Sequence, residues 1–418
     1  MLYTLLSCYH PFQLKPSHEP LGRSPTRNLP TKGYFPLVPP GHVGVVIVDW
    51  MRSPFHRAHK GELSETRPDE MLSQVIKALL ERNPFDTSEI DDIIVGCAYP
   101  EGEQGYNIGR LATFLGEIPV SVPGMTINRL CGSSMQAIMV AASSIQSGWG
   151  ECFLCAGVES MSRVKRRGFN WSPHPSLEAE FPEAYINMGI TAENVADSWE
   201  ISRLSQEEFA LDSHSKAIYA RDNGYFKEEI CPIENDIGMI EEDGCIRDTS
   251  LESMSRLSPV FVENGTVTAA TSSPLTDGVV CMLICSEEFA ERNGMKPLAR
   301  IVSSAVTGCP PELMGIGPIS STKLVLQRSG WEIGDVEIFE INEAFSSQSL
   351  AVINELSIDR GKVNIDGGAI SIGHPLGASG ARIVGKAASL LKRTGSSKAV
   401  ATMCIGGGMG ISVSLERI

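Results

Sequence analysis

The sequence feature that most constrains the fold of this chain is a pattern that occurs twice. Residues 78–96 and 324–342 each contain a helix end, a turn, an acidic step and an apolar strand. Residues 131–157 and 379–406 each contain a helix that starts with small residues, a turn and an apolar strand that ends in glycine. Because the two pairs occur in the same order, they predict two duplicated halves. Chance similarity between two α/β units is the alternative interpretation.

The first half indicates which elements the repeat contains. The apolar run at residues 45–49 predicts a buried strand of a parallel sheet, and residues 68–82 carry apolar side chains at helical spacing. Residues 93–97 predict a second buried strand. This order is typical of an α/β architecture. Ligand sites of open sheets collect where strands lead into helices, so we expect equivalent junctions of the two halves to lie near a shared interface.

Composition narrows the class of protein. The chain has 42% hydrophobic and 20% charged residues, which is typical of a soluble globular protein, and it has no apolar run near the ~18 residues of a membrane span. Its formal net charge of −15 disfavours general nucleic-acid binding. We therefore expect no nucleic-acid partner and no integral membrane segment.

The cysteines indicate the compartment. They number eleven, an odd count, and are scattered along the chain. This pattern favours a reducing compartment, with the cytoplasm as the default, and no disulfide framework. Cys152 and Cys155 are separated by Phe153 and Leu154, which predicts a buried strand rather than a metal site. We expect no metal centre.

Residues 1–42 differ from the rest. They contain eight prolines, four basic residues and one acidic residue, Glu19, and show no apolar period. Such a segment cannot bury enough surface to offset its ordering entropy. We expect a disordered or non-native N-terminal extension, with a transit peptide as an alternative, and an ordered protein that begins near Val43.

Cys131 is a candidate nucleophile. It lies between the mostly apolar residues 122–127 and the helical residues 137–146. A helix N-terminus favours a thiolate, so we expect the pKa of this thiol to fall below the ~8.5 of free cysteine. The alternative is a small buried hydrophobic residue, which is the role of most free cysteines.

Three positions in the second half carry further chemistry. Asn342 ends an apolar strand, His374 lies between glycines before a helix that begins near Ser379, and Cys404 precedes a glycine run that includes Gly406. Each has a structural alternative as a cap, a turn or a core residue. Together with Cys131 they supply a nucleophile, a base, a second thiol and oxyanion donors. That set indicates acyl transfer through a thioester.

Four stretches resemble the signature motifs of the thiolase family in order and approximate spacing. They are NRLCGSS at 128–134, NEAF at 342–345, GHPLGASGAR at 373–382 and CIGGGMG at 404–410. The resemblance covers about residues 43–418 and is strongest to bacterial 3-ketoacyl-CoA thiolases, the β-subunits of fatty-acid-oxidation complexes. Many relatives have glycine where Ser134 stands, but a serine should fit the first turn of a helix.

The resemblance implies a fold. We expect a five-layered α-β-α-β-α arrangement of two duplicated halves with an inserted loop domain. The N-terminal half would comprise residues 43–162 and 269–290, and the C-terminal half residues 291–418. Residues 163–268 would form the loop domain over CoA.

The resemblance also implies a mechanism. Cys131 would attack a 3-ketoacyl-CoA after giving its proton to His374. Cys404 would protonate the departing acetyl-CoA enolate and later deprotonate the incoming CoA. His374 and a water held by Asn342 would bind the thioester oxygen, and the N–H groups of Cys131 and Gly406 would bind the acyl-enzyme oxygen. No cofactor is implied, because CoA is a substrate.

Four residues resemble CoA contacts of the family. Ser273 matches a serine near the pantetheine, and Arg247 matches a basic residue near the nucleotide end, although its alignment needs a one-residue gap. Met188 and Phe345 match residues that line the acyl and pantetheine channel. Family members are dimers or dimers of dimers, and the β-subunit type pairs with a hydratase/dehydrogenase α-subunit.

Three other readings compete with 3-ketoacyl-CoA thiolysis. An acetoacetyl-CoA thiolase working in the condensing direction would use the same residues, but biosynthetic relatives often carry histidine at the position of Asn187. A ketoacyl synthase normally uses two histidines, where this chain has Asn342 and His374. A non-catalytic acyl-CoA-binding protein would not need Cys131, His374 and Cys404 together.

Overall fold

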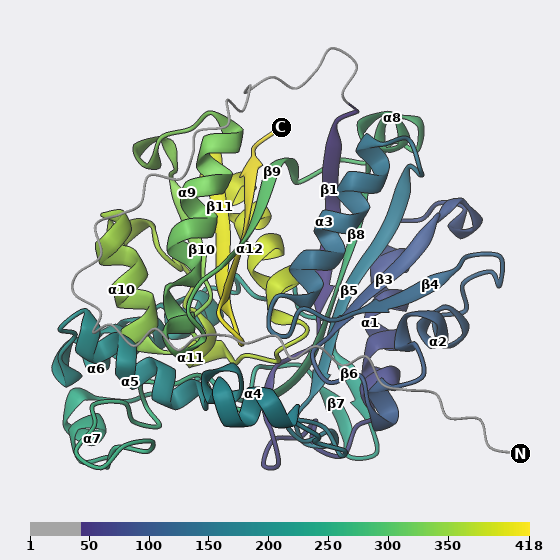
Figure 1. Cartoon of the computed structure of the whole chain (residues 1–418). Helices are drawn as coiled ribbons and strands as arrows, with labels where there is room; N and C mark the ends of the chain where they lie inside the picture. Colours follow the sequence, from purple (N-terminus) through teal and green to yellow (C-terminus); the bar gives the residue numbers. More distant parts are fainter. Residues whose placement is uncertain (1–42) are drawn as a thin grey trace, which may run out of the picture. The chain divides into compact units, whose positions relative to one another are not determined.

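The computed structural model of the chain describes residues 43–418 (Figure 1), and the predictions for residues 1–42 lie outside this range. The strands are β1 (Val45–Arg52), β2 (His56–Arg57), β3 (Asp92–Cys97), β4 (Gly124–Ile127), β5 (Cys152–Ser160), β6 (Ile233–Asn235), β7 (Gly238–Ile240), β8 (Thr276–Ser286), β9 (Ala299–Gly308), β10 (Ile338–Ile341), β11 (Lys398–Ile405) and β12 (Met409–Glu416). The helices are α1 (Pro68–Arg82), α2 (Ile108–Leu115), α3 (Ser133–Gln146), α4 (Pro175–Glu180), α5 (Met188–Ser198), α6 (Arg203–Asp222), α7 (Leu251–Ser255), α8 (Glu287–Arg292), α9 (Gly317–Ser329), α10 (Ser346–Leu356), α11 (Ala369–Ile372) and α12 (Ser379–Thr394).

The main sheet contains the same pairing pattern twice. Its strand order is β10-β11-β12-β9-β1-β8-β5-β3-β4, and β1 meets β9 at Val46 and Arg300. On one side, β3 is parallel to β4 and β5, which is followed by antiparallel β8 and β1. On the other, β10 is parallel to β11, which is followed by antiparallel β12 and β9. A parallel bridge from Phe339 to Val363 corresponds to the β3–β4 pair. The pairing therefore agrees with duplicated halves.

The prediction of a parallel strand at residues 45–49 is wrong. This segment lies in β1, which pairs antiparallel with both β8 and β9. The apolar run arises because β1 lies inside the sheet with α1 and α12 packed against it. Burial on two faces therefore explains the composition of the strand but does not determine its direction.

The helices form three layers around the two halves of the sheet. Helices α3 and α12 pack against each other and share one core with strands of both halves. Helices α1 and α2 cover the other face of the first half, and α9 and α10 that of the second. The central helices approach closely, since a Cβ added at Gly380 would lie 2.6 Å from the backbone nitrogen of Met135. This is a five-layered α-β-α-β-α fold.

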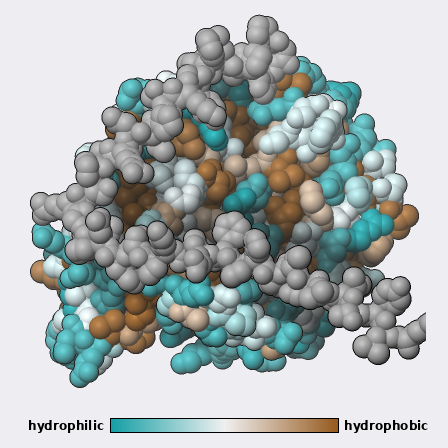
Figure 2. Space-filling model, in the orientation of Figure 1, coloured by the Kyte–Doolittle hydropathy of each residue, from teal (hydrophilic) through white to brown (hydrophobic). Residues whose placement is uncertain are grey.

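Helices α4 to α7 and strands β6 and β7 lie along the bottom of Figure 1. Of these, α5 and α6 pack against α10, and α6 also contacts α11, which leads toward His374. Hydrophilic residues and smaller hydrophobic groups alternate over the visible surface of the described chain (Figure 2). Within residues 43–418, no helix combines the length and apolar character that crossing a membrane requires.

Candidate active site

Cys131 follows a tight turn between β4 and α3. The side chain of Asn128 accepts a hydrogen bond from the Leu130 N–H at 2.7 Å, and Ser133 Oγ accepts one from the Arg129 N–H at 2.9 Å. Leu130 has a φ of 45°, which lies in the left-handed region that side chains disfavour. Such strain persists only where surrounding contacts hold it, and it is common at functional sites.

The Cys131 thiol is half-buried and receives hydrogen bonds from the backbone N–H groups of Gly406 and of Cys131 itself. Burial nevertheless raises its pKa to about 11, and the Glu159 carboxylate adds to that rise. The prediction of a lowered pKa is therefore wrong. For this thiol, the loss of hydration outweighs the two N–H groups. The N-terminus of α3 lies two residues later, at Ser133, and does not offset that loss.

His374 lies in the short loop between α11 and α12. Gly373 has a φ of 116°, and the His374 N–H donates to Thr276 Oγ1 at 3.0 Å. The ring nitrogen Nδ1 lies 2.5 Å from Ser379 Oγ. Burial, with a smaller effect of the Arg382 charge, lowers the pKa of His374 to about 3. The imidazole is therefore neutral near pH 7 and available as a proton acceptor.

Asn342 follows β10 directly and is fully buried. Its N–H donates to the Thr402 carbonyl at 3.0 Å, and its side-chain Nδ2 lies 3.4 Å from His374 Nε2. Its Oδ1 is buried without a hydrogen-bond partner among residues 43–418. The amide NH₂ therefore faces the histidine, and the amide oxygen remains available to accept a hydrogen bond.

Cys404 lies near the end of β11 and is buried. Burial raises its pKa well above the ordinary value, and the neighbouring thiols of Cys131 and Cys309 raise it further. The structure thus brings both sequence-predicted thiols, Cys131 and Cys404, to the same place. Apolar residues pack around Cys404: Ala192, Val267, Met314, Ala344 and Phe345, with Met188 and Phe261 at the edge of the cluster.

Three of the four predicted CoA contacts lie beside this cluster. Ser273 donates hydrogen bonds from its N–H and Oγ to the Ala344 carbonyl, at 3.0 and 3.1 Å. Phe345 belongs to the cluster, and the sulfur of Met188 lies 3.5 Å from a Cβ added at Gly406.

Arg247, the fourth, is not part of the cluster. It is exposed and forms no ion pair with any carboxylate of the described chain. Burial of part of the side chain and the nearby charge of Arg57 lower its pKa. An unpaired cation of this kind can accept an anionic ligand group.

The arrangement combines a thiol with a neutral imidazole, a second thiol, an amide and two backbone N–H groups. It can therefore carry an acyl group on one thiol while the other moves protons. No set of three or more His, Cys, Asp or Glu side chains within the described part of the chain is placed to hold a metal ion.

Comparison with known families agrees with this chemistry. The family model described as "Thiolase, N-terminal domain" matches residues 45–288, and "Thiolase, C-terminal domain" matches residues 295–417. The chain belongs to the thiolase family. The predicted family is confirmed, and the ketoacyl synthase reading is set aside.

Individual relatives are similar over most of their length. A 3-ketoacyl-CoA thiolase of Marinobacter nauticus is 45% identical over 386 residues, covering 90% of this chain and 98% of the relative. A 3-ketoacyl-CoA thiolase of Serratia proteamaculans is 45% identical over 387 residues, covering 90% and 99%. A crystal structure of the Bacillus anthracis acetyl-CoA acetyltransferase is 37% identical with a TM-score of 0.83, covering 90% of this chain and 99% of that one.

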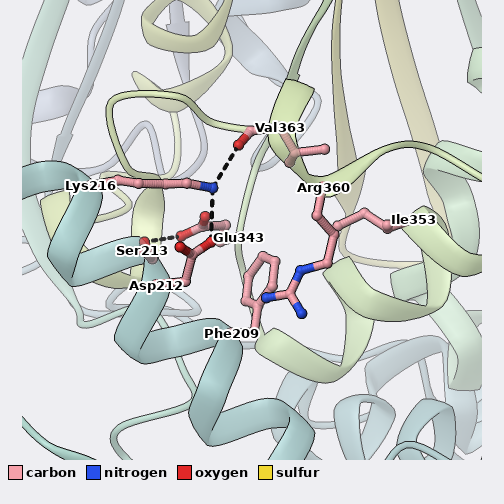
Figure 3. Close-up of a pocket in the computed structure, with 8 residues that line it drawn as sticks. All are labelled: Phe209, Asp212, Ser213, Lys216, Glu343, Ile353, Arg360 and Val363. Carbon is pink, nitrogen blue, oxygen red and sulfur yellow. Dashed lines mark hydrogen bonds and ion pairs between the residues drawn. The ribbon is translucent and has the colours of Figure 1, made fainter.

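Glu343 fixes the NEAF motif of this thiolase through hydrogen bonds, and we predicted no role for it from the sequence. The buried carboxylate accepts hydrogen bonds from Ser213 Oγ and Asn364 Nδ2, both at 2.7 Å, and from the Ile370 N–H at 3.1 Å. Figure 3 shows Glu343 facing Ser213 of α6, with Lys216 beside it. Glu343 thus joins the loop that carries Asn342 to α6 and α11.

Glu159 is a second residue of the site for which we predicted no role from the sequence. Its buried carboxylate accepts hydrogen bonds from the N–H groups of Ala98 and Gly377, both at 2.9 Å, and from Gln104 Nε2 at 2.8 Å. It therefore connects the end of β5 to the loop that carries His374. The only signal in the sequence was an acidic residue at the end of an otherwise apolar strand.

Ser134 fits the first turn of α3, as predicted. Its Oγ accepts a hydrogen bond from the Ala381 N–H at 2.8 Å, and its N–H donates to the Gly377 carbonyl at 3.2 Å. The serine thereby satisfies a backbone donor in the first turn of α12 and ties the two central helices together.

Proposed function

We propose that this protein is a 3-ketoacyl-CoA thiolase of fatty-acid β-oxidation. It cleaves 3-ketoacyl-CoA with CoA and forms acetyl-CoA and an acyl-CoA two carbons shorter. The observation that carries this proposal is a pair of contacts: Cys131 lies near Cys404, and the neutral His374 faces the Asn342 amide. Backbone hydrogen bonds from Ser134 to Gly377 and from Asn342 to Thr402 join the loops that carry these residues. The relatives from Marinobacter nauticus and Serratia proteamaculans carry the same name.

In the first half-reaction, Cys131 passes its proton to His374 as its sulfur attacks the 3-keto carbon. A pKa of about 11 for the thiol and about 3 for the histidine keeps the resting pair neutral, so ionisation accompanies attack rather than preceding it. The carbon–carbon bond then breaks. The acyl group remains on Cys131, and the acetyl-CoA enolate takes a proton from Cys404.

In the second half-reaction, Cys404 removes the thiol proton of the incoming CoA. The CoA thiolate attacks the acyl thioester on Cys131, and the cysteine leaves with the proton held by His374. A second thiol is needed because the first is acylated at this stage.

Two groups of donors stabilise the oxyanions. The backbone N–H groups of Cys131 and Gly406 already bond the thiol, and in the acyl-enzyme they would bind the carbonyl oxygen. His374 and a water on Asn342 would bind the thioester oxygen. Losing one such donor generally lowers the rate by about a hundredfold or more.

The CoA site extends from this centre. Met188 and Phe345 would line the channel for the pantetheine and acyl group, Ser273 would contact the pantetheine, and Arg247 would meet a phosphate. The segment 163–268 would cover the CoA as a loop domain between halves of 43–162 with 269–290 and 291–418. CoA is consumed as a substrate, and the proposed steps use no metal or redox cofactor.

We also propose a homodimer or dimer of dimers in the cytoplasm, with a hydratase/dehydrogenase α-subunit as a further partner. The strand β4 supports self-association, because it ends the described sheet and pairs only with β3 among residues 43–418. Exposed backbone donors and acceptors of an edge strand can pair with another chain.

The experiment that tests this function is CoA-dependent cleavage of 3-ketoacyl-CoA substrates of four, eight and sixteen carbons. Wild type is compared with Cys131→Ala and with Cys231→Ala, which removes another buried thiol outside the site. We expect cleavage that increases with chain length, is lost in Cys131→Ala and persists in Cys231→Ala.

The other outcomes separate the alternatives. Activity confined to acetoacetyl-CoA would identify a short-chain acetyl-CoA acetyltransferase, the activity named for the Bacillus anthracis structure. If folded protein supplied with a candidate α-subunit binds acyl-CoA but shows no thiolysis, the protein is a non-catalytic acyl-CoA-binding protein.

A further inference from the structure

The hydroxyl of Ser379 has no part in the steps described above, yet it touches the catalytic histidine. Ser379 is the first residue of α12, and only 1% of it is exposed. Its Oγ lies 2.5 Å from His374 Nδ1 and 2.9 Å from the Pro375 carbonyl oxygen. The serine therefore bridges the histidine ring and the loop backbone.

The hydrogen bonds around the ring run in one direction. Nδ2 of Asn342 faces His374 Nε2 at 3.4 Å, and an amide NH₂ can only donate. Nε2 then offers its lone pair, so the proton of the neutral ring lies on Nδ1 and points to Ser379 Oγ. The Ser379 hydroxyl uses its own proton on the Pro375 carbonyl, which can only accept.

The opposite arrangement leaves a conflict. If Ser379 donated to Nδ1, the ring proton would lie on Nε2 and face the donor Nδ2 of Asn342. Two donors would then meet in a buried site, and a buried donor without an acceptor is costly.

We propose that Ser379 is a positioning residue that fixes the neutral tautomer of His374 with its proton on Nδ1. Nε2 is thereby left as the acceptor for the proton of Cys131. The use of Nε2 as a base rests on the proposed thiolase function, whereas the tautomer itself does not.

The proton balance follows from this assignment. When Cys131 attacks, its S–H proton moves to Nε2 and the ring becomes an imidazolium with two N–H groups. The Nδ1–H bond to Ser379 is unchanged, and the new Nε2–H can donate to the substrate oxygen. Ser379 neither gains nor loses a proton.

The loop holds the ring in this orientation. The His374 N–H is bonded to Thr276, and a Cβ added at Gly373 would lie 2.7 Å from Thr276 Cγ2. Because the backbone is fixed on one side of the ring and Ser379 lies on the other, the side chain is constrained from both ends.

The direct test is NMR of the full-length protein without substrate, with ¹⁵N in the histidine rings. Wild type is compared with Ser379→Ala, and His374→Asn identifies the His374 signals. Ser321→Ala is the matched control, because Ser321 is also a buried serine near a helix start whose Oγ contacts a proline carbonyl. Far-UV circular dichroism and thermal unfolding verify the fold of each variant.

We expect wild type and Ser321→Ala to show a protonated Nδ1 and an unprotonated Nε2 at His374. Ser379→Ala should populate the Nε2–H tautomer. A wild-type ring with its proton on Nε2 would overturn the proposal, even if Ser379→Ala fails to fold. An unchanged tautomer in folded Ser379→Ala would overturn it as well.

Thiolysis provides a second readout. Ser379→Ala should lower kcat on the order of tenfold to a hundredfold, a part of the ~10²–10⁴ contributed by a positioned base, with KM almost unchanged. Ser379→Thr, which keeps a hydroxyl, should recover most of that loss. If no variant, wild type included, cleaves any 3-ketoacyl-CoA but the tautomer changes as expected, the proposed function fails and the role of Ser379 stands.

Discussion

At the scale of single residues, the two thiols of the site differ because their surroundings differ. Cys131 is half-buried and receives two backbone N–H groups, whereas Cys404 lies in an apolar cluster. The thiol of Cys131 contributes to the raised pKa of Cys404. Acylation converts the Cys131 thiol into a thioester that cannot ionise, so Cys404 is the thiol left to deprotonate CoA at that stage.

This difference yields a prediction for Cys404→Ala. At pH 7 the variant should lose activity by about 10²–10⁴, because neither the enolate nor CoA has its proton-transfer group. The deficit should shrink toward pH 9, since a free thiol with a pKa near ~8.5 ionises without a base. Thiolysis rates at pH 7, 8 and 9 measure it. Cys309→Ala, beside Cys404, serves as the control, and an activity ratio that does not change with pH would contradict the proposed role.

Residue types and local patterns were enough to select Cys131, His374, Cys404 and Asn342 as candidates, because each lies in a short motif, and their catalytic roles stay predictions. They were not enough for Glu159, whose partner Gly377 is 218 positions away in the sequence. They were also not enough for the pKa of Cys131, which depends on the burial created by packing.

At the scale of elements, periodicity predicted helix and strand positions well. The helix predicted at residues 68–82 is α1, and the strand at 93–97 lies within β3. Strand direction was not predictable, as β1 shows, because an apolar run records burial and not the direction of its neighbours.

Helix α6 carries a group whose titration should affect stability. His214 is buried, and neither ring nitrogen has a hydrogen-bond partner within residues 43–418. Burial, with a smaller effect of the Arg247 charge, lowers its pKa to about 4. Because the folded pKa lies below the unfolded one, the unfolded state binds the proton first. The contribution of His214 to the free energy of unfolding therefore falls as pH drops below about 6.5 and levels off below about 4.

The expected size of this effect is about 2 kcal/mol of unfolding free energy between pH 8 and pH 5. Wild type should lose that much relative to His214→Phe, which does not titrate. Urea unfolding followed by circular dichroism at both pH values measures it. His214→Gln separates charge from packing, because it keeps a polar group without titrating. If wild type and both variants show the same pH dependence, the histidine is not buried as the structure has it.

At the scale of the whole molecule, duplication creates one shared site and one free edge. The junction after β4 and the loop before α12 come from different halves, yet the Ser134 N–H donates a hydrogen bond to the Gly377 carbonyl and so holds the two side by side. The sheet of the first half ends at β4, which lies at the right side of Figure 1. In the second half, the bridge between Phe339 and Val363 replaces the corresponding strand. The two edges are therefore not equivalent, although the sequence repeat predicted similar halves.

The exposed residues around β4 lead to a prediction about assembly. Tyr106 is 92% exposed and Val120 is 73% exposed, and the neighbouring Asn107 is bonded to the Gly124 carbonyl of β4. If β4 pairs with β4 of a second copy around a two-fold axis, these side chains are buried in the interface. The double variant Tyr106→Asp with Val120→Asp should then weaken self-association at least tenfold, because it places charges in an interface that excludes water.

Analytical ultracentrifugation over a range of concentrations measures this change. Leu204→Asp is the control, because Leu204 is 55% exposed on α6, outside the proposed interface. The control should keep the wild-type assembly while the double variant sediments as a monomer with unchanged circular dichroism. A double variant that assembles as wild type does would show that the β4 edge is not the interface. The proposed catalytic residues all lie within one chain, so a monomeric double variant that retains thiolysis would also separate assembly from chemistry.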